Sequence, residues 1–143
     1  ADSSFFNILS FNILKGSKAE PLKGVNSISI SKSLSDKLFK NEDPIGKTLQ
    51  VGPKCTFQVN SVFDDITQNS SLRFDYVLPI ELFLKENPWT QNWHSGAIST
   101  FVMLKSKDMQ EQANIKIAGL ISKNCSSCTT SPFIEVSLLP LVL

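Results

Sequence analysis

Residues 38 to 51 read LFKNEDPIGKTLQV, and this stretch carries the chain from a helix into a hairpin. Its Gly46-Lys47-Thr48 triplet has the ending of a phosphate-binding loop, in which consecutive backbone N–H groups close round a phosphate. Such a loop needs a glycine at position 41, where this chain has asparagine, and a helix directly afterwards. The alternating run Leu49-Gln50-Val51 predicts a short strand instead. We therefore interpret the stretch as a structural turn, in which Pro44 fixes its own φ and Gly46 accepts a positive φ.

Outward from this turn, hydrophobic periodicity predicts an alternation of short strands and a few helices. Strands are predicted at 25–30, 47–51, 55–63, 74–78, 97–105 and 133–138. Helices are predicted after the capping residue Ser31, at 80–85 and at 109–123, where Asp108 is the expected N-cap. In the last helix, Ala113, Ile117, Leu120 and Ile121 share one face. Residues 64–71 and 87–96 are expected to be irregular.

Length and composition are those of an ordinary globular chain. The 143 residues are 41% hydrophobic and 19% charged, with a formal net charge of +1. A chain of this size buries enough surface for a stable core without metal or disulfide support. The scattered basic residues exclude nucleic acid as the main partner, because nucleic-acid binding needs clustered Lys and Arg.

The chain carries no targeting or membrane-spanning pattern in its sequence. No run approaches the eighteen or so apolar residues that cross a bilayer, and the first residues lack the features of a signal peptide. An amphipathic pattern at the start, with Phe5, Phe6 and Ile8, and an apolar finish favour a fragment of a longer protein over a complete cytosolic one.

The three cysteines are Cys55, Cys125 and Cys128. The spacing of Cys125 and Cys128 suits half a zinc site or a redox dithiol. A zinc site needs four ligands, and a redox dithiol normally sits at a helix N-terminus, whereas this pair follows a predicted helix. We favour a loop pair, free or locally oxidised, with a structural disulfide and redox chemistry as the alternatives, and we expect no metal and no cofactor.

Residues for catalysis are few. His94 is the single histidine, and Glu86 is the nearest preceding carboxylate, so a general base or triad would need distant partners. Asp64 and Asp65 could bind a cation with Asn69, but residues of this type more often form turns and caps. We expect no catalytic residues, and we expect the chain not to be an enzyme.

Five separate blocks resemble a known family in order and spacing over about residues 2 to 105. They are Phe5 to Gly16, Ser27 to Ser31 leading into Leu38-Phe39, Glu42 to Lys47, Phe57-Gln58-Val59, and Asp65 with Asn69-Ser70 and Phe74-Asp75. Together they resemble the MacB-type periplasmic core domain, the extracytoplasmic insert of MacB/FtsX-like ABC transporter permeases, in a version similar to those of Bacteroidetes. Ser61 departs from the family's usual glycine, and Thr67 and Ser71 replace a usual Pro and His.

The resemblance implies an α+β fold in two lobes. One lobe, called Porter, is built of strand-helix-strand units and is split in sequence, and a mixed lobe, called Sabre, is inserted into it. Matching the blocks gives 1–22 as the end of the first Porter-like segment, 23–96 as the Sabre-like lobe and 97–143 as the second Porter-like segment. The earlier part of the Porter lobe would lie upstream of Ala1.

The function implied is non-catalytic transmission of ATP-driven motion on the periplasmic side of the bacterial inner membrane. Such domains serve export of antimicrobial peptides or lipoproteins and other envelope processes. The implied partners are an ABC ATPase subunit or domain, acting through a transmembrane part, a second permease copy, and a periplasmic adaptor or substrate.

Two other functions remain open. A periplasmic binding module for an adaptor, lipoprotein or envelope enzyme would use the loop that carries Trp89 and Trp93, because aromatic side chains anchor interfaces. Packing of both tryptophans in the core is the alternative for that loop. An enzyme that depends on His94 is the second rival.

Overall fold

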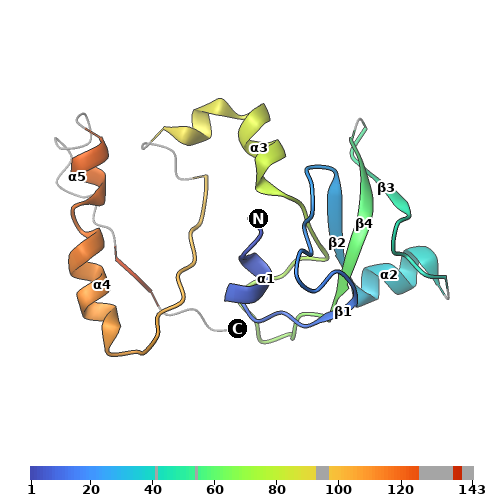
Figure 1. The fold of residues 1–143 in the computed structure, drawn as a ribbon, viewed down its shortest axis with the longest axis horizontal. Coiled ribbons are helices and arrows are strands. Elements are labelled where there is room, and N and C mark those ends of the chain that lie inside the picture. The colour runs from blue at the N-terminus through green and yellow to red at the C-terminus, as the bar shows by residue number, and fades with distance from the viewer. Residues whose placement is uncertain (41, 54, 93–96, 126–136, 140–143) are drawn as a thin grey trace. The chain divides into compact units, whose positions relative to one another are not determined.

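The computed structural model describes residues 1–40, 42–53, 55–92, 97–125 and 137–139. The chain divides into two compact units, Ala1–Glu86 and Asn87–Leu141, which are described separately (Figure 1). The first unit contains a mixed sheet with helices, and this confirms the predicted α+β class.

The sheet of the first unit has five strands. They are β1 (Ile13–Gly16), β2 (Ser27–Ser31), β3 (Thr48–Val51), β4 (Cys55–Phe63) and β5 (Tyr76–Val77). The order is β1-β4-β2-β5, and β3 pairs with β4 as well. β1 and β3 run antiparallel to β4, β2 runs parallel to it, and β5 runs antiparallel to β2. The predicted hairpin is confirmed, because Val51 and Cys55 are paired across its turn.

Both short helices predicted in the first unit, after Ser31 and at 80–85, are present. The helices are α1 (Phe5–Ile8), α2 (Lys32–Phe39), α3 (Ile80–Glu86), the 3₁₀ helix η1 (Pro88–Gln91), α4 (Met109–Ile117) and α5 (Leu120–Asn124). α2 begins as predicted, since the Ser31 hydroxyl accepts a hydrogen bond of 3.1 Å from the Leu34 N–H. The helix ends at Phe39, because the next residue, Lys40, has a φ of 54°, which lies outside the helical region.

A bulge in β4 decides which side chains face which side of the sheet. Val59 pairs with Ile28 and Ser61 with Ser29, so Asn60 is an extra residue on β4. Side chains alternate between the two faces along a strand. Because of the extra residue, each side chain of β4 after Asn60 lies on the face opposite to the one that regular alternation would give it. Val62 therefore joins the side of Val59, whereas Ser61 lies beside Ser29 on the opposite face.

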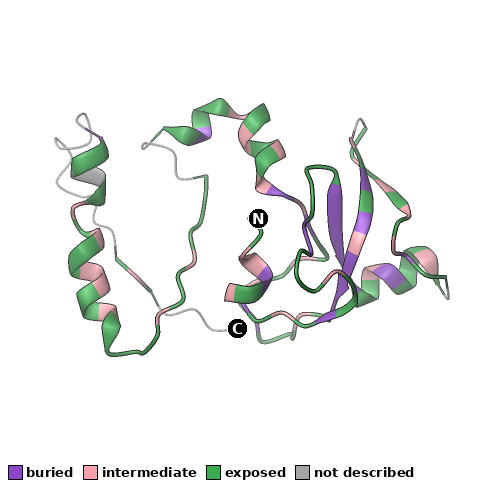
Figure 2. Ribbon diagram, viewed as in Figure 1, coloured by how far each residue is buried: buried purple, intermediate pink, exposed green. Residues whose placement is uncertain are grey.

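Each face of the sheet has its own hydrophobic cluster. Ile28, Ile30, Phe57, Val59 and Val62 form one cluster, covered by residues that include Leu34, Phe39, Ile45 and Leu82. Phe6, Ile13, Leu22, Phe63 and Val77 form the other. The second cluster continues into aromatic contacts among Phe5, Phe11 and Phe74, with ring centroids 5.5 to 5.8 Å apart. Figure 2 shows this burial concentrated in the sheet.

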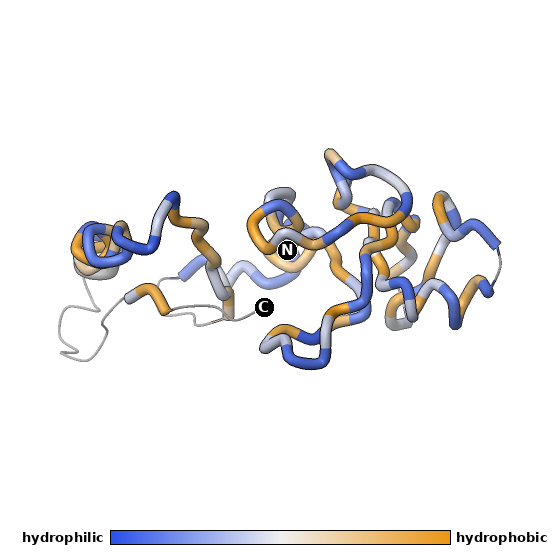
Figure 3. Tube along the Cα trace, turned by 90° about the horizontal axis from the view of Figure 1, so that it is seen from below, coloured by the Kyte–Doolittle hydropathy of each residue, from blue (hydrophilic) through white to orange (hydrophobic). Residues whose placement is uncertain are grey.

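The second unit differs most from the prediction. The strand predicted at 97–105 is wrong, because residues 97–104 have no regular secondary structure. The sequence pattern suits a strand, but a strand needs a neighbour for its N–H and C=O groups, and no strand of the described part of this unit offers one. Ile98, Val102 and Met103 are 40%, 56% and 60% exposed. Figure 3 shows the hydropathy of each residue along the chain.

The predicted helix at 109–123 is present but interrupted. It ends at Ile117 and resumes at Leu120, and Gly119 lies in the break, where glycine is unfavourable for a helix. The predicted Asp108 cap is wrong, since its side chain makes no capping hydrogen bond and its backbone is already helical. Most of the strand predicted at 133–138 lies outside the described residues; Ser137 and Leu138 are not in a strand. The irregular segment predicted at 87–96 contains the helix η1.

Candidate functional site

The turn at Gly46 is a structural one. Gly46 has φ +81°, and its N–H donates to the Val59 carbonyl at 2.8 Å. Its carbonyl accepts from the side-chain amide of Gln58 at 3.0 Å. The Lys47 N–H donates to the Pro44 carbonyl at 3.1 Å. A phosphate-binding loop needs these N–H groups unoccupied, so the geometry agrees with the turn predicted from the sequence.

The Lys47 ammonium is also occupied by neighbours of the turn. It forms an ion pair with Glu42 and lies 5.3 Å from the centre of the Phe39 ring. The hydrogen bond from Lys47, followed by its charge, lowers the pKa of the Glu42 carboxyl. Lys47 therefore fastens the end of α2 to the start of the hairpin.

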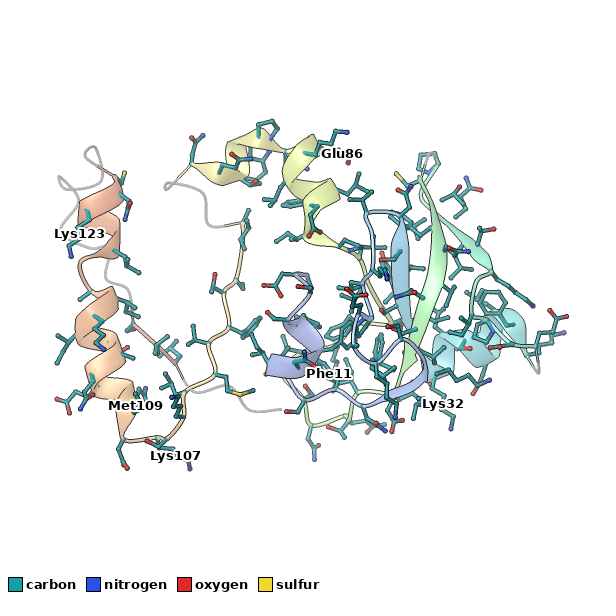
Figure 4. All side chains as sticks on the ribbon, in the orientation of Figure 1. Phe11, Lys32, Glu86, Lys107, Met109 and Lys123 are labelled. Atoms are coloured by element: carbon teal, nitrogen blue, oxygen red, sulfur yellow. The ribbon has the colours of Figure 1, made fainter. Side chains whose placement is uncertain are left out.

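Asp65 caps helix α2 from a distant loop. Its two carboxylate oxygens accept the Ser33 N–H at 2.8 Å and the Ser33 hydroxyl at 2.7 Å. Partial desolvation raises the pKa of the Asp65 carboxyl, but the hydrogen bonds from Ser33 and the charges of Lys32 and Lys37 outweigh it, so the net pKa is lowered. Lys32 is labelled in Figure 4, at the start of α2.

The neighbouring Asp64 uses its carboxylate locally, since it accepts the Asp65 N–H at 3.0 Å. Asp64 and Asp65 thus serve as turn and cap, the interpretation preferred over a cation site with Asn69. Among the residues that the structure describes, no three His, Cys, Asp or Glu side chains are placed to hold a metal ion together.

Trp89 is the one predicted partner-binding residue that the structure describes. It lies in η1 and its side chain is 53% exposed. The indole N–H donates to the Asn87 side-chain oxygen at 3.2 Å, and the buried Thr90 donates its hydroxyl to the Asn87 carbonyl at 2.7 Å. Of the two alternatives for Trp89, the exposure of its ring is against packing in a core.

Three other candidates lie outside the described residues: Trp93, His94 and Cys128. Cys125 is disulfide-bonded and buried, and Cys55 is free. No helix in the described ranges combines the length and hydrophobicity required to cross a bilayer.

Sequence reasoning missed a buried polar cluster between β2, β4 and the segment before β2. The Ser29 hydroxyl donates to the Pro21 carbonyl at 2.8 Å and lies 2.7 Å from the Ser61 hydroxyl. Both serines are fully buried. The alternating serines of Ser27 to Ser31 are the signal in the sequence, but the bulge at Asn60 brings Ser61 to the same face and has no such signal.

Comparison with solved structures identifies the same fold in three domains. A domain of a protein assigned as a permease from Porphyromonas gingivalis has a TM-score of 0.65 and 20% identity, and the match covers 97% of this chain and 66% of that one. The periplasmic region of MacB from Actinobacillus actinomycetemcomitans has a TM-score of 0.56 and 16% identity, covering 86% and 56%. The extracellular domain of the noncanonic ABC-type transporter YknZ from Gram-positive bacteria has a TM-score of 0.59 and 18% identity, covering 87% and 62%.

The chain thus spans about two thirds or less of these structures, and at such low identity the likeness concerns the fold alone. No curated protein matches the sequence significantly. The model of the MacB-like periplasmic core domain, however, matches residues 1–120, which is most of the chain. The chain therefore belongs to the MacB-like periplasmic core domain family.

Proposed function

We propose that this chain is the extracytoplasmic domain of a MacB/FtsX-type ABC transporter permease and that it transmits ATP-driven motion without doing chemistry itself. The family match over residues 1–120 carries the proposal. The proposed site is the periplasmic side of the bacterial inner membrane, with the chain as part of a membrane protein. The proposed lobes are the Porter-like segments 1–22 and 97–143 and the Sabre-like lobe 23–96.

Motion transmission needs a body that keeps its shape under load. The first unit meets this need, since both faces of its sheet are packed and α2 is fixed at each end. Asp65 and Ser31 fix its start, and the Lys47 contacts with Glu42 and Phe39 fix its end. The proposed partners are an ABC ATPase, a second permease copy, and a periplasmic adaptor or substrate such as a peptide or lipoprotein.

The test is a distance measurement between two copies of the domain in the full-length permease with its ATPase. A spin label at Leu38→Cys, an exposed position on α2, is introduced with Cys55→Ser to remove the free thiol. We expect ATP to shift the distance between the labels by several ångströms, and an ATPase variant that binds but does not hydrolyse ATP to hold one of the two distances. Identical distances in every nucleotide state would contradict motion transmission.

The exposure of Trp89 favours a second function, a binding module for an adaptor, lipoprotein or envelope enzyme. On this alternative, Trp89→Ala weakens capture of the periplasmic partner at least tenfold while the thermal unfolding of the domain is unchanged. Gln91→Ala, at an exposed position of the same 3₁₀ helix, is the matched control. Equal binding by both variants would remove Trp89 as an anchor.

A further inference from the structure

Residues Ser17–Gly24, which we call the strap, join β1 to β2 across the serine-bearing face of the sheet. Its outer residues are exposed, whereas Pro21 and Leu22 are buried beneath them. Glycines at positive φ mark its two ends: Gly16 at +83° and Gly24 at +84°. Leu22 is the strap's single member of the hydrophobic clusters.

Polar contacts hold most of the strap in place. The Pro21 carbonyl accepts from the Ser29 hydroxyl at 2.8 Å and from the Asn60 side-chain amide at 3.0 Å, and the Ser61 hydroxyl donates to the Ser29 oxygen at 2.7 Å. The side-chain amide of Asn60 also donates to the Glu20 carbonyl at 2.7 Å. Donors from β2 and β4 thus converge on one short stretch of strap backbone.

The opposite face is covered by apolar side chains that include Leu34 and Phe39 of α2, whereas the strap combines the apolar contact of Leu22 with the hydrogen bonds to the Glu20 and Pro21 carbonyls. Apolar cover cannot be replaced by water without loss of the hydrophobic contribution. Hydroxyl and amide groups, in contrast, exchange a protein partner for water at small net cost. A cavity of about 490 Å³ lined by Lys23, Gly24 and Asn60, among others, lies along the end of the strap and brings solvent to the edge of the polar cluster.

We propose that the strap opens as a local unit, pivoting at Gly16 and Gly24, while the sheet and its α2 face stay folded. Opening exposes Ser29 and Ser61 to water and removes Leu22 from its cluster. It leaves intact the β2–β4 pairing and the packing of Leu34. β1 stays paired with β4 when the strap opens, and this property of the strap is independent of the transport proposal.

Native-state hydrogen exchange of the 143-residue chain, read by NMR over a series of low guanidinium concentrations, tests the opening. The Ser17 and Ser27 amides, bonded to the Asn60 and Gly24 carbonyls, report on the strap. The Val59 and Asp64 amides, bonded to the Lys47 and Asn12 carbonyls, report on the sheet. We expect the strap amides to exchange at least tenfold faster than the sheet amides, with little dependence on denaturant.

Two variants separate local opening from global unfolding. Ser29→Ala removes a strap contact and should speed exchange at Ser17 and Ser27 about five- to tenfold, the effect of one buried hydrogen bond. Leu34→Ala weakens packing that is present whether the strap is closed or open, so it lowers the free energy of global unfolding but not that of strap opening. It should therefore speed exchange at Val59 and leave the exchange rates of the strap amides unchanged. If Leu34→Ala accelerates all four amides equally, the strap opens only when the domain unfolds and the proposal is wrong. The wild type and Leu34→Ala decide this even if Ser29→Ala does not fold.

Discussion

Gly16 shows how a single residue is fixed by both its backbone angle and its surroundings. Its φ is +83°, and a Cβ placed there would lie 2.2 Å from the Asn60 carbonyl oxygen and 2.9 Å from the Ser61 Cα. Gly24 has nearly the same φ, +84°, but no atom of the described residues lies within 4 Å of its Cβ position. The two positions therefore separate the cost of the backbone angle from the cost of the contact.

Substitution by alanine should destabilise the domain at both glycines, and more at Gly16. Gly24→Ala is expected to cost about 1 kcal/mol of unfolding free energy, since only the positive φ is penalised. Gly16→Ala is expected to cost about 1–3 kcal/mol more, because backbone atoms must move to admit the methyl group. Urea unfolding of both variants measures the difference. Equal losses of unfolding free energy in Gly16→Ala and Gly24→Ala would mean that β1 and β4 separate easily at Gly16.

Asp65 makes the second prediction at the residue scale. Asp65→Ala should lower the unfolding free energy by about 1 kcal/mol, as loss of a helix cap does. Because the folded pKa of Asp65 is lowered, its contribution is present above the unfolded pKa of about 3.9 and is lost as pH falls through the folded pKa. The difference between wild type and Asp65→Ala should therefore shrink below about pH 4.

The control is Asp36→Ala, which removes a carboxylate from the same helix α2 without removing a cap. It should leave stability within about 0.5 kcal/mol of the wild type. Chemical unfolding at pH 7 and pH 3 supplies all the values. A cost for Asp65→Ala that does not change with pH would show that its charge is irrelevant to the cap.

At the scale of elements, local signals predicted those elements that local interactions decide. Ser31 caps α2 through a bond three residues away, and the hairpin around Gly52 closes between strands adjacent in sequence. The strand at 97–105 was wrong because a strand depends on a partner, which its own residues do not specify. The face exchanged at Asn60 was missed for a related reason: only the pairing with β2 reveals the extra residue.

The candidate site was predictable to a similar extent. The turn role of Gly46 followed from the residue types around it, whereas Trp89 lies in the 3₁₀ helix η1, inside a segment predicted to be irregular. The sequence predicted that Asp65 forms a turn or a cap, but not which helix it caps, because its partner Ser33 is 32 residues away. Contacts of that range depend on the folded sheet and leave no periodic pattern in the sequence.

The break between α4 and α5 gives a prediction about an element. Gly119→Ala should join the two helices and raise the unfolding free energy by about 0.5–1 kcal/mol, because alanine favours a helix over glycine. Among the residues that the structure describes, a Cβ at this position would meet the Lys123 Cε at 3.7 Å, an ordinary contact, and nothing nearer. Far-UV circular dichroism should show more helix. Ala118→Gly, the reverse change at the adjacent position, should show less, and a loss of helix in Gly119→Ala would contradict the assignment of the break to glycine.

At the scale of the whole molecule, buried apolar side chains are distributed unevenly between the two units. Both hydrophobic clusters lie within residues 1–82. In the described part of the second unit, α4 has no buried residue, and Ile115 and Leu139 are 72% and 84% exposed. Hydrophobic burial is the main favourable term in folding, so among the described residues the first unit supplies most of the stability.

The two units should therefore behave differently when separated. A chain of residues 1–86 is expected to fold alone and to unfold cooperatively within about 5 °C of the full chain, because it retains both clusters and every strand pair of the sheet. A chain of residues 87–143 should show no cooperative transition, since its described residues supply no hydrophobic cluster. Calorimetry and amide NMR dispersion of the two pieces and the full chain measure both outcomes. An unfolded 1–86 piece would mean that the sheet depends on residues beyond Glu86, and the division into units would then have no energetic meaning.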